Sequence, residues 1–392
     1  MDSVKKAVIA AVDPLAPRWI ELSDKIHANP ETNFKEYKAS KWLTDAAREL
    51  GCSVELGVGG IDTAFTAAYD SGKPGPAVGV IVEYDALEGL GHACAHNTKG
   101  PGALLGLEAF IKAAPDFRGK IVVFGCPAEE GGGGKVIMAE NNVFDNVDVC
   151  LEFGTSSEWG TGPRRFARQR LLLTARGKSA HAALRNLKSI NAFDALLYVL
   201  ENFRYLRKTL GDDGLINAVM LDGGKAPSVI PDLAVVNMEV RALKRSIMDK
   251  YVDLVERVVS IAADASGAKI DIKKSSVYAD AVKCPSLANL IMDNFKEFGL
   301  EDPQWLLDED ALGSSDVGNV SHIVPTETIN IGLGKGLVAH TAEYREASGG
   351  EPGHRVVVDG AKVLDMCLAD LLVHDSSEFL ARVKAEFDAA EK

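Results

Sequence analysis

The chain has 392 residues, more than a single hydrophobic core usually supports, so we expect two domains. Apolar residues make up 46% and charged residues 25%, as in ordinary globular proteins, and no apolar run approaches the roughly 18 residues of a membrane span. The net charge of −13 argues against a nucleic-acid partner. Six cysteines without CxxC spacing are too sparse for a disulfide framework, so we expect reduced thiols.

The N-terminus is a poor match to a secretory signal. Its apolar run AVIAAV covers residues 7–12 and is interrupted at once by Asp13 and Pro14. This stretch fits a first helix better. We therefore expect a cytoplasmic protein that acts on a small molecule and binds neither membrane nor nucleic acid.

The first part of the chain alternates between helical and strand-like patterns. Helical periodicity indicates helices over 2–12, 17–28 and 37–50, and apolar runs indicate strands over 52–58, 63–69 and 77–84. The loop GHACAHNTKG (91–100) then precedes a helix over 104–115, a strand over 120–128, the glycine-rich loop EEGGGGK (129–135) and a strand over 148–154. Such alternation predicts an α/β domain with a largely parallel sheet.

From about residue 168 the order of elements changes. Strand, helix, strand, strand, helix and strand are predicted over 170–177, 189–206, 215–224, 233–243, 246–265 and 268–278. This βαββαβ order is the ferredoxin-like arrangement. Helix–strand alternation returns after about residue 284 and ends in helices over 359–373 and 376–390. We therefore expect an α/β domain of residues 1–167 and 285–392, with a smaller α+β domain, residues 168–284, inserted into it.

Polar side chains follow the predicted strands of the α/β domain. Loops that leave the carboxyl ends of parallel strands converge on one crevice, so these side chains can share a pocket. Carboxylate, imidazole and thiolate together are ligands for zinc, manganese or cobalt. The residues concerned are Asp85, Cys94, His96, Glu129, Glu130, Glu152 and His340.

Other interpretations of these motifs remain open at this point. A four-glycine loop can cradle phosphate, but EEGGGGK lacks the GxxxxGK[ST] spacing and places carboxylates where phosphate would lie. Cys94 and His96 can form a nucleophile and its base, although two residues of separation rarely lets them meet well, and nearby carboxylates raise the thiol pKa. Glu129 and Glu130 can simply cap the next helix. The spacing favours metal binding.

Six segments in chain order resemble the zinc aminoacylase and carboxypeptidase family of metallopeptidases, in its amidohydrolase branch, which includes p-aminobenzoyl-glutamate hydrolases. They are EYDALEGLGHACAHN, PAEEGGGGK, GKSAHAA, GGKAPSVIPD, SSDVGNVSHIVPT and AHTAEYREA. The resemblance implies a catalytic α/β domain with an inserted α+β lid that often forms a dimer interface. A homodimer or higher homo-oligomer through the lid is therefore expected.

The resemblance also implies roles for individual residues. Cys94, His96, Glu130 and His340 would bind one or two divalent ions of zinc, manganese or cobalt. Glu129 would be the general base that deprotonates the attacking water. Asp85 would orient a ligand imidazole, and His181 of the lid would stabilise the developing oxyanion.

Several positions depart from the family pattern. Glu152 stands where a histidine ligand is common, which makes it a further candidate ligand, and Asn97 stands where aspartate is common. In the lid, Ser228 replaces a typical asparagine. Outside the lid, in DVGNVSHIVPT, His322 stands where an aromatic residue is common. With Arg241, these two are the candidate substrate-binding residues. The basic run Arg164, Arg165, Arg168 and Arg170 fits a solvated strand edge or a site for a substrate carboxylate.

Three functions follow from these patterns. The leading hypothesis is a metal-dependent hydrolase of a C–N bond, in the first place the amide bond of an N-acyl or N-aroyl amino acid. The alternative is a hydrolytic deaminase that releases ammonia from an aromatic or other small amine. A non-catalytic binding protein on the same fold is the least supported, because the base and the ligands are all present.

Overall fold

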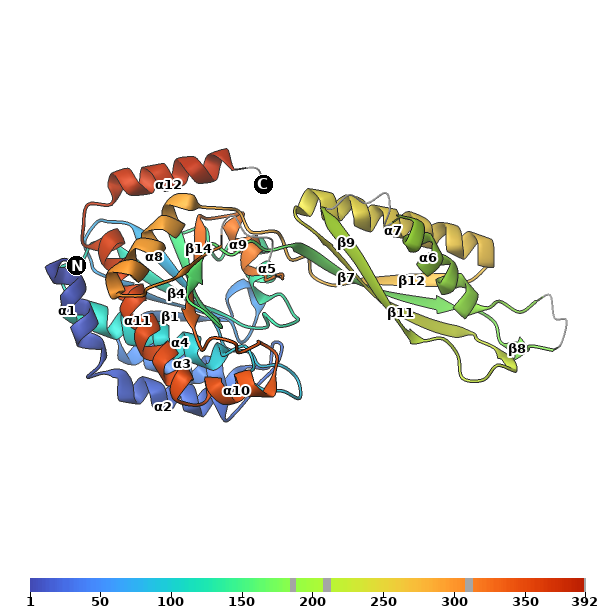
Figure 1. Ribbon diagram of the computed structural model, residues 1–392, viewed down its shortest axis with the longest axis horizontal. Coiled ribbons are helices and arrows are strands. Elements are labelled where there is room, and N and C mark those ends of the chain that lie inside the picture. The colour runs from blue at the N-terminus through green and yellow to red at the C-terminus, as the bar shows by residue number, and fades with distance from the viewer. Residues whose placement is uncertain (184–187, 207–212, 307–312, 391–392) are drawn as a thin grey trace. The chain divides into compact units, whose positions relative to one another are not determined.

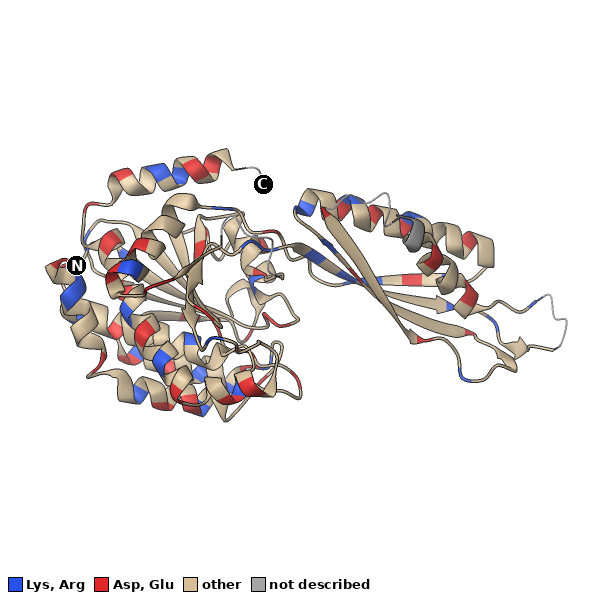
Figure 2. Cartoon of the chain, in the orientation of Figure 1, with Lys and Arg blue, Asp and Glu red and all other residues tan. Residues whose placement is uncertain are grey.

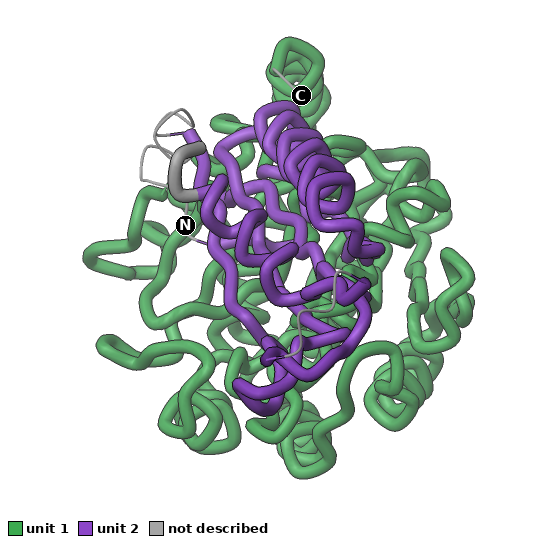
Figure 3. The backbone as a smooth tube through the Cα atoms, turned by 90° about the vertical axis from the view of Figure 1, so that its right-hand side faces the viewer, with its two compact units in different colours: residues 1–164, 281–312, 316–392 green, residues 165–280, 313–315 purple. Residues whose placement is uncertain are grey.

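The computed structural model describes residues 1–183, 188–206, 213–306 and 313–390. It contains two compact units, which Figure 3 colours separately. The first unit comprises residues 1–164, 281–312 and 316–392, and the second comprises residues 165–280 and 313–315. The chain thus enters the second unit from the first and returns to it.

An eight-stranded sheet forms the centre of the first unit (Figure 1). Its four middle strands, in the order β4-β3-β5-β14, run parallel. At one edge, β2 pairs antiparallel with β4, and β1 pairs antiparallel with β2. The strand β3, AVGVIVE, is buried at every position, which explains why its sequence is a continuous apolar run. The strands are β1 (Ser53–Leu56), β2 (Phe65–Asp70), β3 (Ala77–Glu83), β4 (Lys120–Cys126), β5 (Val149–Ser156), β6 (Gly160–Thr161), β13 (Gln304–Trp305) and β14 (Thr326–Gly332).

Helices cover this sheet on both faces. Val80 and Val82 of β3 contribute to one core, whereas Ile81 contributes to the other, as the alternation of a strand requires. The larger core lies under α1 (Ser3–Val12), α2 (Ala16–His27), α3 (Tyr37–Glu49), α4 (His96–Ala113), α8 (Pro285–Phe298) and α11 (Glu351–Leu372). The smaller core lies under η1 (Val58–Gly60), α5 (Gly134–Glu140) and α9 (Val317–Ser321).

Two further helices complete this unit, α10 (Ala342–Ser348) and α12 (Ser377–Ala389). Positive and negative side chains are interspersed along the exposed helix faces, as α12 shows in Figure 2. Among the described residues, no helix combines the length and the apolar character that crossing a membrane requires.

The second unit has its own sheet and core. Its strands pair antiparallel in the order β12-β7-β11-β9, with two helices packed on one face. The elements are β7 (Ala167–Arg176), α6 (Ala192–Leu206), β9 (Gly214–Asp222), β11 (Leu233–Ala242), α7 (Arg245–Ser266) and β12 (Lys269–Lys274), with the short pair β8 (Ala180–His181) and β10 (Val229–Ile230). The predicted fold class, an α/β domain with a largely parallel sheet and an inserted ferredoxin-like domain, is confirmed.

The start of α4 differs from the sequence prediction. A loop is predicted over 91–100 and a helix from 104, but the helix begins at His96, directly after Ala95 in the left-handed conformation. Gly100 and Gly102 allow neighbouring side chains to pack closely against the helix, and neither of them forms a turn. A Cβ added at Gly100 would lie 2.6 Å from Leu43, and one at Gly102 would collide with Phe153. His96 therefore belongs to the first turn of a buried helix, which holds its ring more firmly than a loop would.

Gly102→Ala tests this packing. Alanine has the higher helix propensity, but its methyl group would overlap the Phe153 ring, and overpacking a core costs about 1–3 kcal/mol. We expect a lower free energy of unfolding, measured by urea denaturation followed by circular dichroism. An unchanged or higher midpoint would show that the helix does not depend on this close approach.

Candidate metal centre

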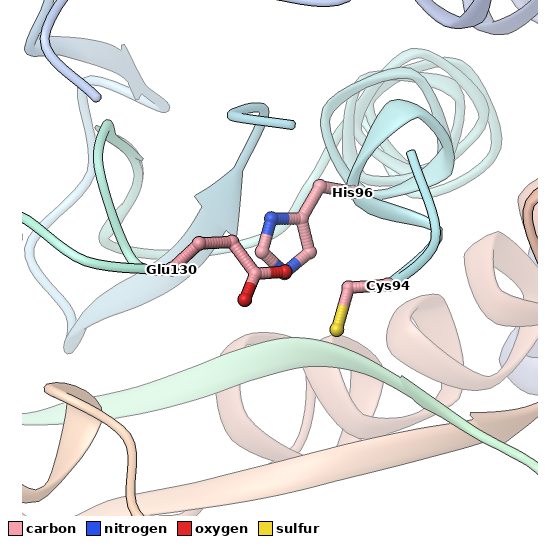
Figure 4. Close-up of side chains that lie close together, drawn as sticks. All are labelled: Cys94, His96 and Glu130. Carbon is pink, nitrogen blue, oxygen red and sulfur yellow. The ribbon is translucent and has the colours of Figure 1, made fainter. Parts of the chain in front are cut away.

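Four of the predicted ligands lie together in the first unit. Atoms of Cys94, His96 and Glu130 that can bind a metal all lie within 4.8 Å of one another (Figure 4). The Nε2 atom of His340 lies 3.1 Å from Cys94 Sγ and 3.4 Å from Glu130 Oε2. Thiol, imidazole and carboxylate groups from three distant parts of the chain thus face one point.

The loops that carry these side chains leave the carboxyl ends of neighbouring parallel strands. Cys94 follows β3, and Glu130 follows β4. Three non-glycine residues in these loops adopt the left-handed conformation, namely Ala95 (φ 56°), Ala128 (φ 60°) and His340 (φ 66°). The His340 amide also donates to the Ala93 carbonyl at 2.9 Å. Strained backbone of this kind persists where the surroundings hold it, and it is concentrated at functional sites.

Asp85 connects two of the loops. Its Oδ1 atom lies 3.0 Å from His96 Nδ1, and its Oδ2 atom accepts the Glu130 backbone N–H at 2.9 Å. The Asp85 carbonyl is also 3.0 Å from His96 Nδ1. The carboxylate therefore fixes the orientation of the imidazole and the position of the neighbouring carboxylate, as the partner of a ligating histidine commonly does.

The charges in this cluster suit a cation. Burial alone would raise the pKa of Glu130, but the hydrogen bond from His340 and the positive charges of both imidazoles hold that pKa at about 2. Hydrogen bonds to Cys94 and Glu130 raise the pKa of His340 to about 10. Glu130 Oε1 is buried and accepts no hydrogen bond from any described residue. The donor set of sulfur, nitrogen and oxygen therefore fits a zinc, manganese or cobalt ion, whose binding would displace the His340 proton.

A second group of charged residues lies deeper, and the sequence reasoning did not identify it. The ammonium of Lys135 pairs with Glu83 and, at 2.6 Å, with Asp316, and the ammonium of Lys99 pairs with Glu83. Signals for it were present in the sequence. Glu83 ends a buried strand two residues before Asp85, and Lys135 ends the glycine-rich loop.

Glu129, the predicted general base, lies beside this group. Its carboxylate is within 4.8 Å of those of Glu83 and Asp316. Burial, followed by the negative charge of Glu83, raises the pKa of Glu129 to about 8. A carboxyl group with such a pKa can both accept and return a proton near neutral pH.

Two predicted site residues of the first unit, Glu152 and His322, have other surroundings, as does Asn97. Glu152 lies outside the three-residue set above, and its Oε2 atom accepts a hydrogen bond from Thr328 Oγ1 at 2.6 Å. His322 caps the C-terminal end of α9 and is partly buried. Asn97 is buried, and its amide donates to Ser23 and Ser348, so it ties helices together.

Three more predicted site residues belong to the second unit. His181 is an exposed residue of β8, and the carbonyl of Ser228 accepts the Ala182 N–H at 2.8 Å. Arg241 Nε donates to Glu239 at 2.6 Å, and Arg170 Nε donates to the same carboxylate at 3.0 Å. The Glu239 carboxylate thus forms ion pairs with Arg168, Arg170 and Arg241 within the sheet.

Glu36 accepts a hydrogen bond from the backbone directly before Glu129 and Glu130. Its Oε1 atom accepts the N–H groups of Phe34 (2.9 Å) and Ala128 (3.1 Å), and its Oε2 atom accepts the Thr63 hydroxyl at 3.0 Å. Burial raises the pKa of Glu36 to about 7. The group therefore supports the Ala128 turn and titrates near neutral pH.

Glu36→Gln tests this assignment through the pH dependence of stability. A raised native pKa favours folding fully below the unfolded pKa of about 4.3, and that contribution is lost as the pH rises to about 7. The amide oxygen can replace Oε1, and the NH₂ group can donate to Thr63. We expect the variant to gain on the order of 2–3 kcal/mol relative to wild type between pH 4 and pH 8, measured by urea unfolding. If the free energies of unfolding of wild type and of Glu36→Gln changed in parallel with pH, the assignment would be contradicted.

Comparison with known proteins identifies relatives over the whole chain. The sequence model of Peptidase family M20/M25/M40 matches residues 69–362. The Xaa-Arg dipeptidase of Mus musculus is 30% identical, over 99% of this chain and 93% of that protein. A p-aminobenzoyl-glutamate hydrolase polypeptide of Escherichia coli is 27% identical, over 79% of this chain and 68% of its own length.

A solved structure agrees with the fold. A dinuclear metal-binding peptidase of the M20 family from Bacillus subtilis superposes with a TM-score of 0.67 at 16% identity, covering 91% of this chain and 99% of that one. The resemblance noted from the sequence is confirmed. Proteins of this family are metal-dependent hydrolases of C–N bonds, with acylated amino acids or dipeptides as substrates. The chain belongs to Peptidase family M20/M25/M40.

Proposed function

We propose that this protein is a metal-dependent hydrolase that cleaves the amide bond of an N-acyl or N-aroyl amino acid. The observation that carries the proposal is the convergence of Cys94, His96, Glu130 and His340 on one point. Beside them, Glu129 has a pKa of about 8. Ligands for a Lewis acid and a proton acceptor are the two elements that hydrolysis by an activated water requires.

Each residue has a task in this scheme. Cys94, His96, Glu130 and His340 bind the ion, which is zinc, manganese or cobalt, and Asp85 holds His96 and the Glu130 backbone in place. When bound, the ion supplies Lewis acidity that lowers the pKa of water and polarises the scissile carbonyl. Glu129 accepts the proton of the attacking water and returns it to the leaving nitrogen.

The lid contributes the remaining roles in the proposal. His181 Nδ1 accepts the Ala183 N–H at 3.1 Å, so in the neutral ring the proton is on Nε2. That N–H is available to donate to the oxyanion of the tetrahedral intermediate. Ser228 and Arg241 of the lid, together with His322 of the first unit, are the residues we assign to substrate binding.

An exposed apolar surface supports a homodimer through the lid. Leu215, Val219 and Leu221 alternate along β9 and are 39%, 57% and 59% exposed, respectively. They lie on the face of the sheet that α6 and α7 leave open, on its edge strand. An apolar edge strand tends to pair with another chain, and a second copy of this strand is the partner we propose.

The free thiols of all six cysteines support a reducing compartment, the cytoplasm.

Glu129→Gln tests the assignment of the base. The amide cannot accept a proton from water, so we expect turnover to fall by a factor of about 10²–10⁴. Metal content should stay at the wild-type level, because Glu129 is not among the proposed ligands. Glu140→Gln, at the exposed end of α5, is the matched control and should keep full activity. Unchanged turnover in Glu129→Gln would refute the role.

Product analysis tests the reaction itself. The panel contains N-acyl and N-aroyl amino acids, Xaa-Arg dipeptides and p-aminobenzoyl-glutamate, which the names of the relatives suggest, together with simple aryl amines. We expect equal amounts of an amino acid and a carboxylic acid from one class, quantified by mass spectrometry. Ammonia released without a second organic fragment would instead establish the deaminase alternative.

Val219→Glu tests the proposed dimer. A carboxylate on the exposed edge strand cannot be buried without an unpaired charge, so we expect dissociation to monomers in size-exclusion chromatography with light scattering. The control is Ile261→Glu on α7, where an apolar side chain is similarly exposed. If the mass of the Val219 variant stays that of a dimer, the interface lies elsewhere.

A further inference from the structure

Lys99 is a buried cation at the edge of the proposed metal centre. It lies in α4, one turn after His96, and is 5% exposed. Its ammonium pairs with Glu83 at the end of β3, and the negative charge of Glu152 on β5 also acts on it. A buried cation at the end of a strand, one turn after a proposed ligand, is placed to influence what that ligand can bind.

Lys99 and Lys135 occupy the second group of metal-binding donors in the described part of the chain. The carboxylates of Glu83, Glu129 and Asp316 lie within 4.8 Å of one another, close enough to hold an ion. However, Lys135 pairs with Glu83 and Asp316, and Lys99 pairs with Glu83. Two ammonium groups are therefore already paired with two of the three carboxylates, where a further cation would have to bind.

His96 links the two groups of donors. Its Nε2 atom lies 3.3 Å from Glu83 Oε2, on the opposite side of the ring from Asp85. Glu152, a predicted ligand, accepts from Thr328 and acts electrostatically on Lys99. Two of the three donors that a second ion would require are therefore already paired: Glu83 with Lys99 and Lys135, and Asp316 with Lys135.

We propose that each chain binds a single divalent ion, at Cys94, His96, Glu130 and His340, and that the Lys99 ammonium supplies the positive charge that a second ion would otherwise supply. This inference rests on the proposed function. It sets the chain apart from the dinuclear Bacillus subtilis relative. A divalent ion next to a buried ammonium would face a repulsion that little solvent screens, whereas Glu83 stabilises the ammonium where it is.

Lys99 is a positioning residue in this proposal. It acts through its ion pair with Glu83 and does not touch the substrate.

The experiment counts ions in the full-length protein. The protein is stripped with a chelator, reconstituted with excess Mn²⁺, freed of unbound metal and analysed by plasma mass spectrometry and electron paramagnetic resonance. We expect one Mn²⁺ per chain and the hyperfine spectrum of an isolated ion. Two ions per chain with an exchange-coupled spectrum would overturn the inference and leave the proposed function standing. No bound Mn²⁺, nor Zn²⁺ or Co²⁺ in the same assay, would overturn both.

Three variants separate the role of Lys99 from the count itself. Lys99→Ala removes the ammonium from Glu83 Oε2, whereas Lys135 stays paired with Oε1, so we expect a second Mn²⁺ per chain in the place of the Lys99 ammonium and a coupled spectrum. Lys99→Arg keeps the charge and should keep the count at one. Lys112→Ala, an exposed lysine on the same helix, is the matched control and should also bind one ion. A folded Lys99→Ala protein that binds one isolated ion would refute the role of Lys99.

If Lys99→Ala does not fold, as circular dichroism would show, Lys99→Gln replaces it in the same comparison. The wild-type count and spectrum remain decisive in either case, since they require no variant.

Discussion

The buried carboxylate of Glu83 is the interaction on which the site depends. It ends the central strand β3, and it pairs with Lys99 from α4 and Lys135 from α5, helices that cover opposite faces of the sheet. A buried charge without partners costs several kcal/mol, so these residues must remain together. The N-terminus of α4, which carries His96, is thereby fixed relative to the glycine-rich loop that carries Glu129 and Glu130.

This arrangement produces two groups of charged side chains, a buried inner tier and a partly exposed outer tier. In the inner tier, lysines balance Glu83 and Asp316, and Glu129 becomes the carboxyl group with the raised pKa. In the outer tier, Cys94, Glu130 and His340 combine thiol, carboxylate and imidazole at a partly exposed point. His96 lies between the tiers, with Glu83 on one side of its ring and Asp85 on the other. The proposed proton acceptor, Glu129, thus lies next to the proposed cation site.

The sequence predicted much of this because its signals are local. Apolar runs identified the parallel strands, and the rule that loops at their carboxyl ends converge placed seven candidate side chains in one pocket. The family resemblance then selected Cys94, His96, Glu130 and His340 as ligands. The predicted start of α4 is wrong because the helix begins within the predicted loop 91–100, where Gly100 packs against Leu43. Lys99 and Glu83 were missed for a related reason. A lysine in a polar loop and a glutamate at a strand end look solvated until the tertiary structure buries both.

The central claim is that Cys94 and its neighbours bind a transition metal. The most direct test is the electronic absorption spectrum of the Co²⁺-reconstituted protein, because thiolate ligation to Co²⁺ produces a charge-transfer band in the near ultraviolet. The account predicts this band in wild type and its loss in Cys94→Ser, with the visible bands of bound Co²⁺ retained. A spectrum without the band, or a band that persists in Cys94→Ser, would contradict the site assigned here.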